Sequence, residues 1–238
     1  MNGKKDWKIE YFNEIASTNE YLKEKRKDRQ NRMAIAYRQS GGKGTKGRSF
    51  SSETGGVYLS VLTFYENFPA KDAFLVMASA AVAVVKTLKS FGLSPVIKWS
   101  NDIFVDGKKI CGILIENTFS GKNVDSSVVG IGLNVNNELP AELLNIATTM
   151  SKVSGKAFDR EEVEKRLIQE LKKTHTMDEY LQYIGYMGEQ AMLVCGETEK
   201  KVTLVSVDQQ GGLTVLTERG EEERFVAAEI SIRLGETL

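Results

Sequence analysis

The sequence predicts an α+β fold, in which a mixed sheet flanked by helices is followed by a small β-barrel. Three observations support this prediction. The chain has 238 residues, of which 41% are hydrophobic, so it can bury the core of one large domain or of a large and a small one. Up to Gly188, strand-like runs alternate with segments of helical period. After Gly188, only short strand-like runs separated by turns remain, which is typical of a small barrel. We therefore expect domains at residues 1–188 and 189–238.

Strands are expected before Gly188 wherever a short run is wholly apolar or rich in β-branched and aromatic residues. These runs lie at residues 7–13, 33–37, 57–64, 96–99, 103–105, 109–116 and 128–136. Asp106-Gly107 is a favourable hairpin turn before the run at 109–116. Alternation along that run places Lys109 on one face with Cys111 and leaves Gly112 on the other. A lysine aligned with apolar neighbours is unusual, so Lys109 either extends its charge into water at a sheet edge or neutralises a bound carboxylate or phosphate.

Helices are expected at residues 17–27, 69–91, 159–171 and 177–184. Ser17 can cap the first helix, and Glu20, three residues later, completes a capping box. Pro69 suits the first position of the second helix, which stops at Gly92. This helix is apolar on most faces, so we expect it to pack against the sheet. The strands of the C-terminal barrel are expected at residues 192–195, 202–207, 213–216, 225–227 and 230–232.

Residues 39–50 form a glycine-rich segment with four glycines, two lysines and an arginine. Glycines let a backbone approach a ligand closely, and successive amides with nearby cations can hold an anion. The segment is therefore either an anion-binding loop or a mobile surface loop. It matches the dinucleotide-binding fingerprint and nearly matches a P-loop, but both motifs need a helix directly after the glycines. Here residues 50–56 form a second loop that leads into a strand, so neither motif applies.

Composition argues against several classes of protein. Lysines plus arginines and aspartates plus glutamates both number 32, which argues against broad, nonspecific nucleic-acid binding and leaves only a local basic loop. Cys111 and Cys195 lie far apart in apolar runs, so we expect reduced core residues. The single His175 is expected at the surface or as a helix cap, which argues against a histidine-based triad or zinc site. No signal peptide is visible, and the longest apolar run, residues 78–85, is too short to span a bilayer, so we expect a cytoplasmic protein.

Five motifs follow one another in order between residues 17 and 136, and the resemblance that they carry covers nearly the whole chain. They are Ser17-Thr18-Asn19; Gln39 with the loop Gly42–Arg48; Lys98-Trp99-Ser100-Asn101-Asp102; Lys109–Glu116; and Gly130–Asn136. Together they resemble the biotin protein ligase family, in which the loop reads GRGRxGR and the third motif reads KWPND. The resemblance implies a class II synthetase-like biotin/lipoate ligase catalytic domain with an SH3-like C-terminal barrel. Because only sixteen residues precede Ser17, the form without an N-terminal DNA-binding domain is expected.

The resemblance also implies a reaction and its partners. Biotin and ATP, with Mg²⁺, would give biotinyl-5′-AMP and pyrophosphate. The biotin would then pass to a lysine of a biotin carboxyl carrier domain, in acetyl-CoA carboxylase or a related carboxylase. Neither DNA nor a membrane is expected as a partner. We expect a monomer or a weak homodimer, because strands at 109–118 and 126–136 could offer a sheet edge to a second copy or to the carrier.

The resemblance assigns site residues by their positions in the motifs. Those expected to bind biotin are Ser17, Thr18, Asn19, Gln39, Lys43, Gly44, Thr45, Lys109 and Gly112. Those expected to bind ATP are Lys43, Arg48, Asn101, Asp102, Asn134 and, in the barrel, Arg233, which is expected to point inward. The catalytic candidates are Lys109, Lys98, Lys43 and Arg48. No direct metal ligand is assigned, and Asp102 is the one residue that could serve as such a ligand. Cations suit this chemistry, because a carboxylate that attacks a phosphate brings two anions together.

The sequence departs from the family motifs at four positions. Lys43 replaces the first loop arginine, which keeps the charge but loses the planar guanidinium. Ser100 replaces the motif proline, and Phe50 replaces the usual tryptophan after the loop. Thr45 replaces the second loop arginine and loses both charge and reach. The adenylate should therefore be held less firmly, unless Lys46 compensates.

Two other functions remain open. One is a lipoate or octanoate ligase or transferase on the related fold. The other is a non-catalytic biotin- or adenylate-binding protein, which the loss of charge at Thr45 suggests. A pocket for a ureido ring needs several small polar groups, which residues 17–19 and Gln39 offer. The presence of Lys98, Asp102 and Lys109 favours catalysis.

Overall fold

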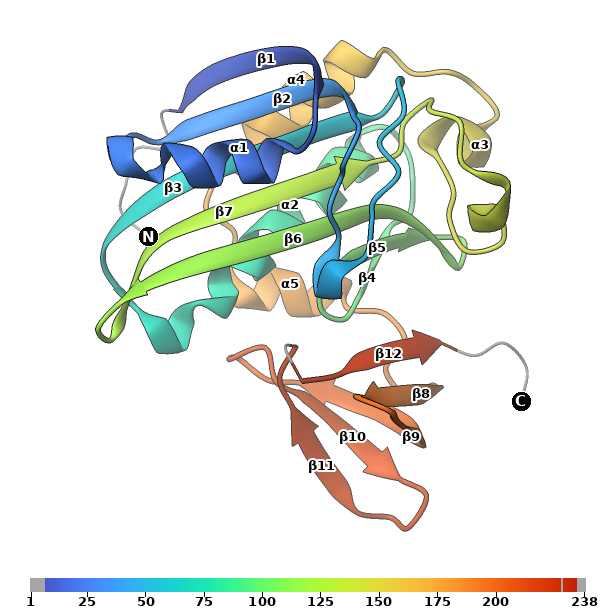
Figure 1. Cartoon of the computed structure of the whole chain (residues 1–238). Helices are drawn as coiled ribbons and strands as arrows, with labels where there is room; N and C mark the ends of the chain where they lie inside the picture. The colour runs from blue at the N-terminus through green and yellow to red at the C-terminus, as the bar shows by residue number, and fades with distance from the viewer. Residues whose placement is uncertain (1–6, 228, 235–238) are drawn as a thin grey trace.

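The computed structural model of the chain describes residues 7–227 and 229–234, which form two β-sheets and the helices that pack on the first of them (Figure 1). The first sheet has seven strands in the order β1-β2-β3-β7-β6-β5-β4. Their bounds are β1 Lys8–Ile15, β2 Arg32–Gln39, β3 Val57–Pro69, β4 Val96–Lys98, β5 Asp102–Val105, β6 Lys108–Ser120 and β7 Asn123–Leu133. β1 pairs with β2 in parallel and the other strand pairs of this sheet are antiparallel, so the sheet is mixed, as expected.

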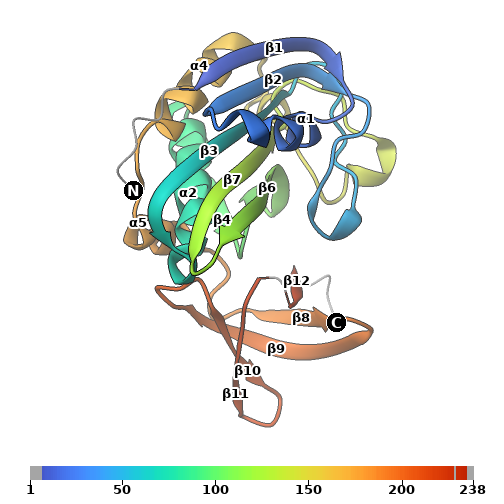
Figure 2. The same ribbon diagram turned by 60° about the vertical axis from the view of Figure 1, so that its left-hand side comes forward.

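Helices cover both faces of this sheet. Their bounds are α1 Thr18–Glu24, α2 Phe74–Ser90, α3 Met150–Ser154, α4 Arg160–Leu171 and α5 Met177–Tyr183, and short 3₁₀ turns lie at Lys25–Asp28, Thr45–Gly47, Ala70–Asp72 and Ala141–Leu143. α1 and the glycine loop lie on one face, and α2, α4 and α5 lie on the other (Figure 1, Figure 2). The Ser17 hydroxyl accepts a hydrogen bond from the Glu20 backbone N–H, so the predicted cap of α1 is confirmed.

The main hydrophobic core lies between the first sheet and α2. By length and composition, the run Ala70–Ser90 could cross a membrane, with a mean hydropathy of 1.6, although residues 78–85 alone are too short. In the fold, 61% of that apolar window is buried, and α2 contacts α4, α5 and β6. A buried core helix has the same apolar composition as a membrane helix, so packing accounts for it here.

The expected start of the second helix and the expected sheet edge at residues 126–136 were both wrong. Pro69 is the last residue of β3, opposite Asn123, and caps the 3₁₀ turn Ala70–Asp72, so the α-helix α2 begins only at Phe74. β7 lies between β3 and β6, so the expected sheet edge at residues 126–136 is not free. β5 pairs with β6 only as far as Gly112, so within the described residues the rest of β6 has a strand neighbour on one side only.

The C-terminal residues form a second, antiparallel sheet of five strands in the order β11-β10-β9-β8-β12. Their bounds are β8 Gln190–Cys195, β9 Thr198–Val207, β10 Leu213–Thr217, β11 Glu222–Phe225 and β12 Ser231–Leu234. Four of the expected barrel strands overlap β8, β9, β10 and β12, but the one expected at residues 225–227 meets β11 at Phe225 only. No pairing joins β11 to β12 among the described residues, so the expected barrel is an open sheet. The domain boundary at Gly188 stays a prediction.

Two expectations about single residues were also wrong. Cys195 is exposed at the end of β8, whereas Cys111 is buried as expected. His175 is buried, with Nδ1 3.4 Å from Lys86 Nζ and Nε2 3.2 Å from the Glu170 carbonyl oxygen. Burial, and next the charge of Lys86, lower the pKa of His175.

Candidate active site

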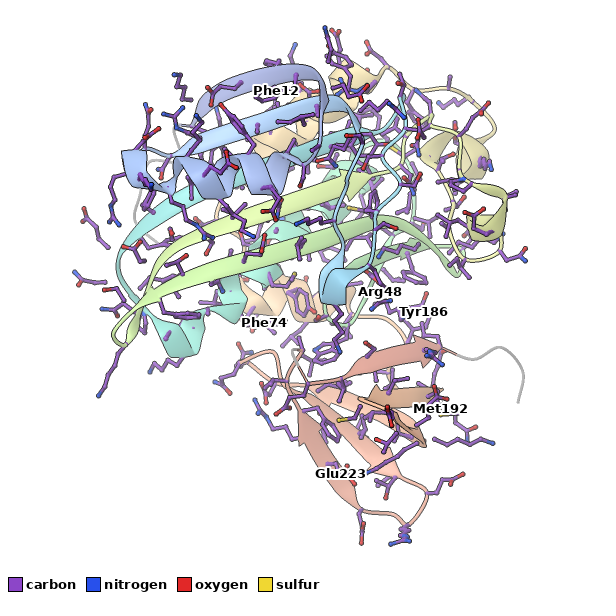
Figure 3. All side chains as sticks on the ribbon, viewed as in Figure 1. Phe12, Arg48, Phe74, Tyr186, Met192 and Glu223 are labelled. Carbon is purple, nitrogen blue, oxygen red and sulfur yellow. The ribbon has the colours of Figure 1, made fainter. Side chains whose placement is uncertain are left out.

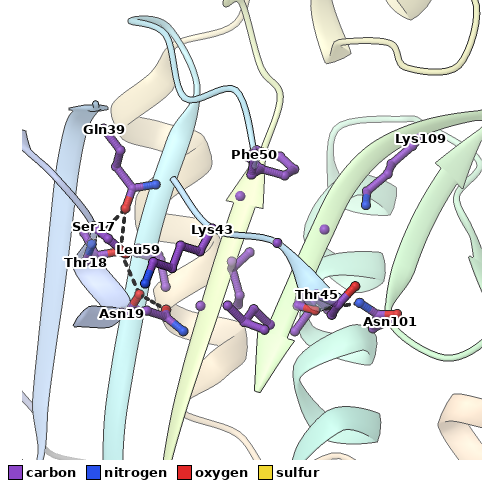
Figure 4. Close-up of a pocket in the computed structure, with 18 residues that line it drawn as sticks. Ser17, Thr18, Asn19, Gln39, Lys43, Thr45, Phe50, Leu59, Asn101 and Lys109 are labelled. Carbon is purple, nitrogen blue, oxygen red and sulfur yellow. Dashed lines mark hydrogen bonds between the residues drawn. The ribbon is translucent and has the colours of Figure 1, made fainter. Parts of the chain in front are cut away.

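A pocket opens on the sheet face that carries α1 and the glycine loop (Figure 4). Its volume is about 470 Å³, including its open mouth. The residues that line it are Ser17, Thr18, Asn19, Gln39, Lys43, Gly44, Thr45, Phe50, Leu59, Ser60, Asn101, Lys109, Gly112, Ile113, Leu114, Gly130, Ile131 and Gly132. Every residue that the resemblance assigns to biotin therefore lines this one pocket, together with Asn101. That these residues bind biotin stays a prediction.

One end of the pocket is a connected set of small polar side chains. The Thr18 backbone N–H and hydroxyl both donate to Gln39 Oε1, at 2.8 and 3.0 Å. Thr18 Oγ1 lies 2.7 Å from Ser60 Oγ, which donates to Asn19 Oδ1 at 2.5 Å. Gln39 Nε2 donates to Ser52 Oγ at 3.0 Å. These bonds fix the orientation of each side chain, so the donors and acceptors are arranged before any ligand binds.

Ser60 and Glu116 contact this polar end but were not among the expected site residues: Ser60 lies outside the motifs, and Glu116 is the last residue of the motif Lys109–Glu116. Ser60 is fully buried on β3 and joins Thr18 to Asn19. Glu116 Oε2 accepts from Asn19 Nδ2 at 3.2 Å, and Glu116 Oε1 pairs with Lys23 at 2.9 Å. A serine within a run of apolar strand residues was the only signal for Ser60, and alternation alone cannot say which face of β3 binds a ligand.

The floor of the pocket is made of glycines on two adjacent strands. Gly112 on β6 pairs with Gly132 on β7, and Gly130 lies two residues before Gly132 on the same face. A methyl group on Gly130 would overlap Asn19 Oδ1, and one on Gly132 would overlap the Phe50 ring. From the sequence, space for the ligand was expected at Gly112 only. The Gly-x-Gly spacing within a strand was the available signal for the other two.

The opposite end of the pocket carries the cationic residue Lys109. Its Nζ forms an ion pair with Asp102 Oδ1 at 2.7 Å, and both side chains are partly buried. The expectation that Lys109 shares a face with Cys111 was wrong. A bulge between β5 and β6 pairs Ile103 with Cys111 but Phe104 with Lys109, so alternation breaks at the skipped residue. Lys109 consequently lies on the pocket face beside Gly112, with Nζ 3.1 Å from where a Gly112 methyl group would be.

Lys98 at the end of β4 and Asn101 in the turn between β4 and β5 flank this end. Asn101 lines the pocket, and its Nδ2 donates to the Ile113 carbonyl oxygen at 2.7 Å. Lys98 pairs in register with Asp102, and its Nζ lies 5.2 Å from the centre of the Phe104 ring. Burial lowers the pKa of Lys98, while the nearby Asp102 carboxylate acts in the opposite direction.

The glycine loop lines the pocket with Lys43, Gly44 and Thr45 and is attached to α1. Lys43 Nζ lies 2.9 Å from Glu20 Oε1, and the Gly44 N–H donates to the Arg48 carbonyl oxygen at 2.7 Å. Glu20 therefore does not complete the expected capping box, because its carboxylate pairs with Lys43 and Lys23. Hydrogen bonds from Lys43 and Lys23 lower the pKa of Glu20.

Several predicted ATP and catalytic residues do not line the pocket. Arg48 is exposed on the loop (Figure 3). Asn134 is buried, and its amide nitrogen donates to the Thr148 carbonyl oxygen while its oxygen accepts from Asn137. Arg233 does not point inward as expected: its side chain is 65% exposed and pairs with Glu199 at 2.7 Å within the second sheet. The roles of Lys98, Asp102 and these three residues stay predictions.

Comparison with known proteins identifies the family. The model of the Biotin/lipoate A/B protein ligase family matches residues 11–134, more than half of the chain. Among curated proteins, the bifunctional ligase/repressor BirA of Bacillus spizizenii is 30% identical over 212 residues, covering 82% of this chain and 64% of that protein. The BirA of Bacillus subtilis is 38% identical over 133 residues, covering 54% of this chain and 41% of that protein. The matches therefore span less than two thirds of these two relatives.

Solved structures agree with the family match over the whole fold. The biotin protein ligase of Aquifex aeolicus, in complex with biotin and ATP, superposes with a TM-score of 0.78 at 31% identity, covering 96% of this chain and 99% of that chain. The predicted fold class is thereby confirmed, apart from the unclosed barrel. This chain belongs to the biotin/lipoate A/B protein ligase family.

Proposed function

We propose that this protein activates biotin with ATP as biotinyl-5′-AMP and then transfers the biotin to a lysine of a biotin carboxyl carrier domain. The observation that carries the proposal is the division of one pocket into two ends. Small polar groups from α1, β2 and β3 gather at one end, and Lys109 with Asn101 lies at the other. A substrate with a polar ring, an apolar chain and a terminal carboxylate fits this order of groups. The related ligase of Aquifex aeolicus, solved with biotin and ATP, has the same fold.

The polar end suits a ureido ring, which offers both N–H donors and a carbonyl acceptor. Gln39 Oε1 and Asn19 Oδ1 are acceptors, and the hydroxyls of Ser17 and Thr18 can donate or accept. A buried polar network discriminates strongly against ligands that leave its members unpaired. The glycine floor between the two ends gives the flat, close surface that a fused ring system needs.

The cationic end suits attack of a carboxylate on the α-phosphate of ATP. In that step a carboxylate oxygen bonds to phosphorus and pyrophosphate leaves, so negative charge accumulates at the reacting centre. Lys109 is placed to neutralise that charge, and loop amides with Lys43 add further positive potential. In the second step a lysine amine of the carrier attacks the acyl carbon and AMP leaves. The loop must open to admit that amine.

Mg²⁺ would accompany ATP. Among the described residues, no group of three or more His, Cys, Asp or Glu side chains could hold a metal, so phosphates would supply most ligands. One carboxylate with substrate phosphates is a donor set that Mg²⁺ accepts, and Asp102 is the candidate carboxylate. When bound, the ion neutralises phosphate charge.

The carrier and the setting of the protein extend this proposal. A carrier domain of acetyl-CoA carboxylase or a related carboxylase is the expected acceptor, in the cytoplasm. The edge of β6 beyond Ile113, which has no strand neighbour on that side among the described residues, is a surface on which the carrier and a second copy of the chain would compete. A monomer or weak homodimer, with neither DNA nor membrane as partner, stays a prediction. Sedimentation with and without carrier tests the competition, because carrier should lower any dimer fraction.

Pyrophosphate release tests the proposal against its alternatives. The purified protein is given ATP and Mg²⁺ with either biotin or lipoate, in the absence of carrier. The proposal expects biotin-dependent release and little release with lipoate. Preference for lipoate would assign the chain to the other activity of its family, and tight biotin binding without release would indicate a non-catalytic binding protein.

A further inference from the structure

The second sheet contacts the segment that leads to the nucleotide end of the pocket. Trp99 belongs to residues 98–102, between β4 and β5, and its indole N–H donates to the Gly211 carbonyl oxygen at 3.0 Å. Both groups are buried, and Trp99 is only 7% exposed. Gly211 lies in the turn at residues 208–212, which joins β9 to β10. This bond therefore links positions 112 residues apart, from one sheet to the other.

The turn at residues 208–212, here termed the Gly211 turn, is held in one conformation from several sides. Asp208 Oδ1 accepts from the backbone N–H groups of Gln210 and Gly212, at 2.8 and 2.9 Å. Asp208 Oδ2 accepts from Arg224 Nε at 2.6 Å, and these hydrogen bonds lower the pKa of Asp208. Gly211 itself has φ +78°, a left-handed conformation that favours glycine.

The Gly211 turn packs directly against the first domain at the start of α2. A methyl group on Gly211 would overlap the Phe74 ring, so the backbone and the ring are in close contact. Figure 3 shows Phe74 at the boundary between the two sheets. The Phe74 ring packs edge-on against Tyr180, with 5.4 Å between ring centres, and the Tyr180 hydroxyl donates to the Ser100 carbonyl oxygen at 2.8 Å. The turn therefore contacts residues 98–102 directly, through the bond from Trp99 to Gly211, and indirectly, through Phe74 and Tyr180.

The chain that connects the two sheets contacts β4 at Ile97, directly before residues 98–102. Gly185 N–H donates to the Ile97 carbonyl oxygen at 3.0 Å, and Ile184 forms a parallel bridge with Ile97. The strand β4 has only three residues and pairs with β5 alone in the described sheet, so its outer side depends on this connection. Residues 98–102 are therefore fixed by contacts with the second sheet, α5 and the linker.

We propose that Gly211 and Trp99 are positioning residues, through which the second sheet sets the geometry of Asn101 and Asp102 at the pocket. This inference rests on the proposed function, because it assigns those two residues to the nucleotide end. Asn101 lines the pocket, and Asp102 orients Lys109 by an ion pair of 2.7 Å. Displacement of residues 98–102 moves both contacts and leaves the polar end, built from α1, β2 and β3, in place. The second sheet therefore acts more on use of ATP than on binding of biotin.

The experiment compares two turn glycines that differ in what surrounds them. Gly211→Ala places a methyl group against Phe74 at φ +78°, whereas the matched control Gly220→Ala has φ +79° and nothing within 4 Å. Both substitutions carry the same backbone strain, so their difference isolates the contact. Trp99→Phe is the second variant, which keeps an aromatic ring and removes the indole donor. For each protein we would measure kcat and KM for ATP in pyrophosphate release, and the Kd for biotin without ATP.

The expected result is a split between the two ligands. Gly211→Ala and Trp99→Phe should lower kcat/KM for ATP by about tenfold or more, since displacement of reacting groups by about 1 Å can cost ~100-fold. The Kd for biotin should change much less than kcat/KM for ATP, and Gly220→Ala should match the parent protein in both measurements. Equal losses in ATP use and biotin binding, or a Gly211→Ala protein that matches Gly220→Ala, would overturn the positioning role.

A measurement without catalysis separates this inference from the proposed function. The chain has two tryptophans, so the indole N–H of Trp99 is one of two such NMR signals. Its exchange with solvent should be slow in the parent and in Gly220→Ala, and faster in Gly211→Ala. Rapid exchange in the parent protein would refute the contact itself. Slow exchange in a parent that releases no pyrophosphate would refute the proposed function instead.

Discussion

Replacing Lys109 by alanine removes the charge that the proposed reaction depends on most. Lys109 lines the pocket on the same face as the glycine floor, and its Nζ lies 2.7 Å from Asp102. The bulge in β6 brings it there, so the neighbouring lysine cannot substitute for it. That neighbour, Lys108, donates instead to the Leu144 carbonyl oxygen at 2.9 Å, at the protein surface.

The size of the effect follows from the interaction that the substitution removes. Removal of one preorganised charged donor at a reacting centre raises the barrier by ~2–4 kcal/mol, or about 30- to 1,000-fold at ~1.4 kcal/mol per tenfold. The ion pair with Asp102 is partly exposed, so its removal should lower the free energy of unfolding by at most ~1 kcal/mol. Lys109→Ala should therefore abolish most adenylation in a protein that still folds.

The assay is single-turnover formation of biotinyl-5′-AMP, with thermal unfolding measured in parallel. Lys108→Ala is the matched control, since it removes the same charge one residue away without touching the pocket. Its rate should stay within about twofold of the parent, as is usual for surface substitutions. A folded Lys109→Ala protein with the parent rate would refute the assignment, and so would an equal reduction in Lys108→Ala.

Three further predictions follow from the loop, from Thr45 and from His175. Residues 41–53 are attached to α1 by the exposed ion pair between Lys43 and Glu20. Limited proteolysis should therefore cleave this loop in the absence of ligand, and biotin plus ATP should protect it. Equal cleavage with and without ligand would contradict this. Thr45→Arg adds a guanidinium to the pocket lining and should slow release of the adenylate about tenfold, measured by displacement with unlabelled ligand. An unchanged release rate would contradict this and would mean that Lys46 or other groups already hold the adenylate. Burial and the charge of Lys86 lower the pKa of His175, so protonation favours the unfolded chain and stability falls as the pH drops below the ordinary pKa of histidine. His175→Gln should therefore reduce the fall in Tm between about pH 7.5 and about pH 5.5. Parallel curves of Tm against pH for the variant and the parent would contradict this.

Much of the fold could be predicted because hydrophobic patterns and turn residues act locally. Asp106 and Gly107 both have positive φ and form the expected hairpin, and Gly92 ends α2 with φ +84°. Failures arose where contacts distant in sequence decide. Pro69 caps the 3₁₀ turn before α2 and also ends β3, and its pairing with Asn123 in β7 cannot be read from local sequence. The barrel remains open because closure depends on geometry between β11 and β12 that short apolar runs do not encode.

In the candidate site too, features set by local sequence could be predicted and features set by distant contacts could not. The motif residues at positions 17–19 and 39 come together because α1 starts where β1 ends, beside β2, which the order of elements already implies. Lys109 lines the pocket, but its expected face was wrong, because a bulge leaves no mark in an alternating sequence. Ser60 and Glu116 were missed since their role depends on contacts with Asn19 across the sheet.

Transfer of biotin to a carrier tests the central claim most directly. The protein is incubated with biotin, ATP, Mg²⁺ and a biotin carboxyl carrier domain, and the mass of the carrier is measured. A parallel carrier has its acceptor lysine replaced by arginine. The proposed function predicts that the first carrier gains one biotinyl group, only when ATP is present, and that the second gains none at that position. An unmodified first carrier, in the presence of all substrates and a folded protein, would contradict it.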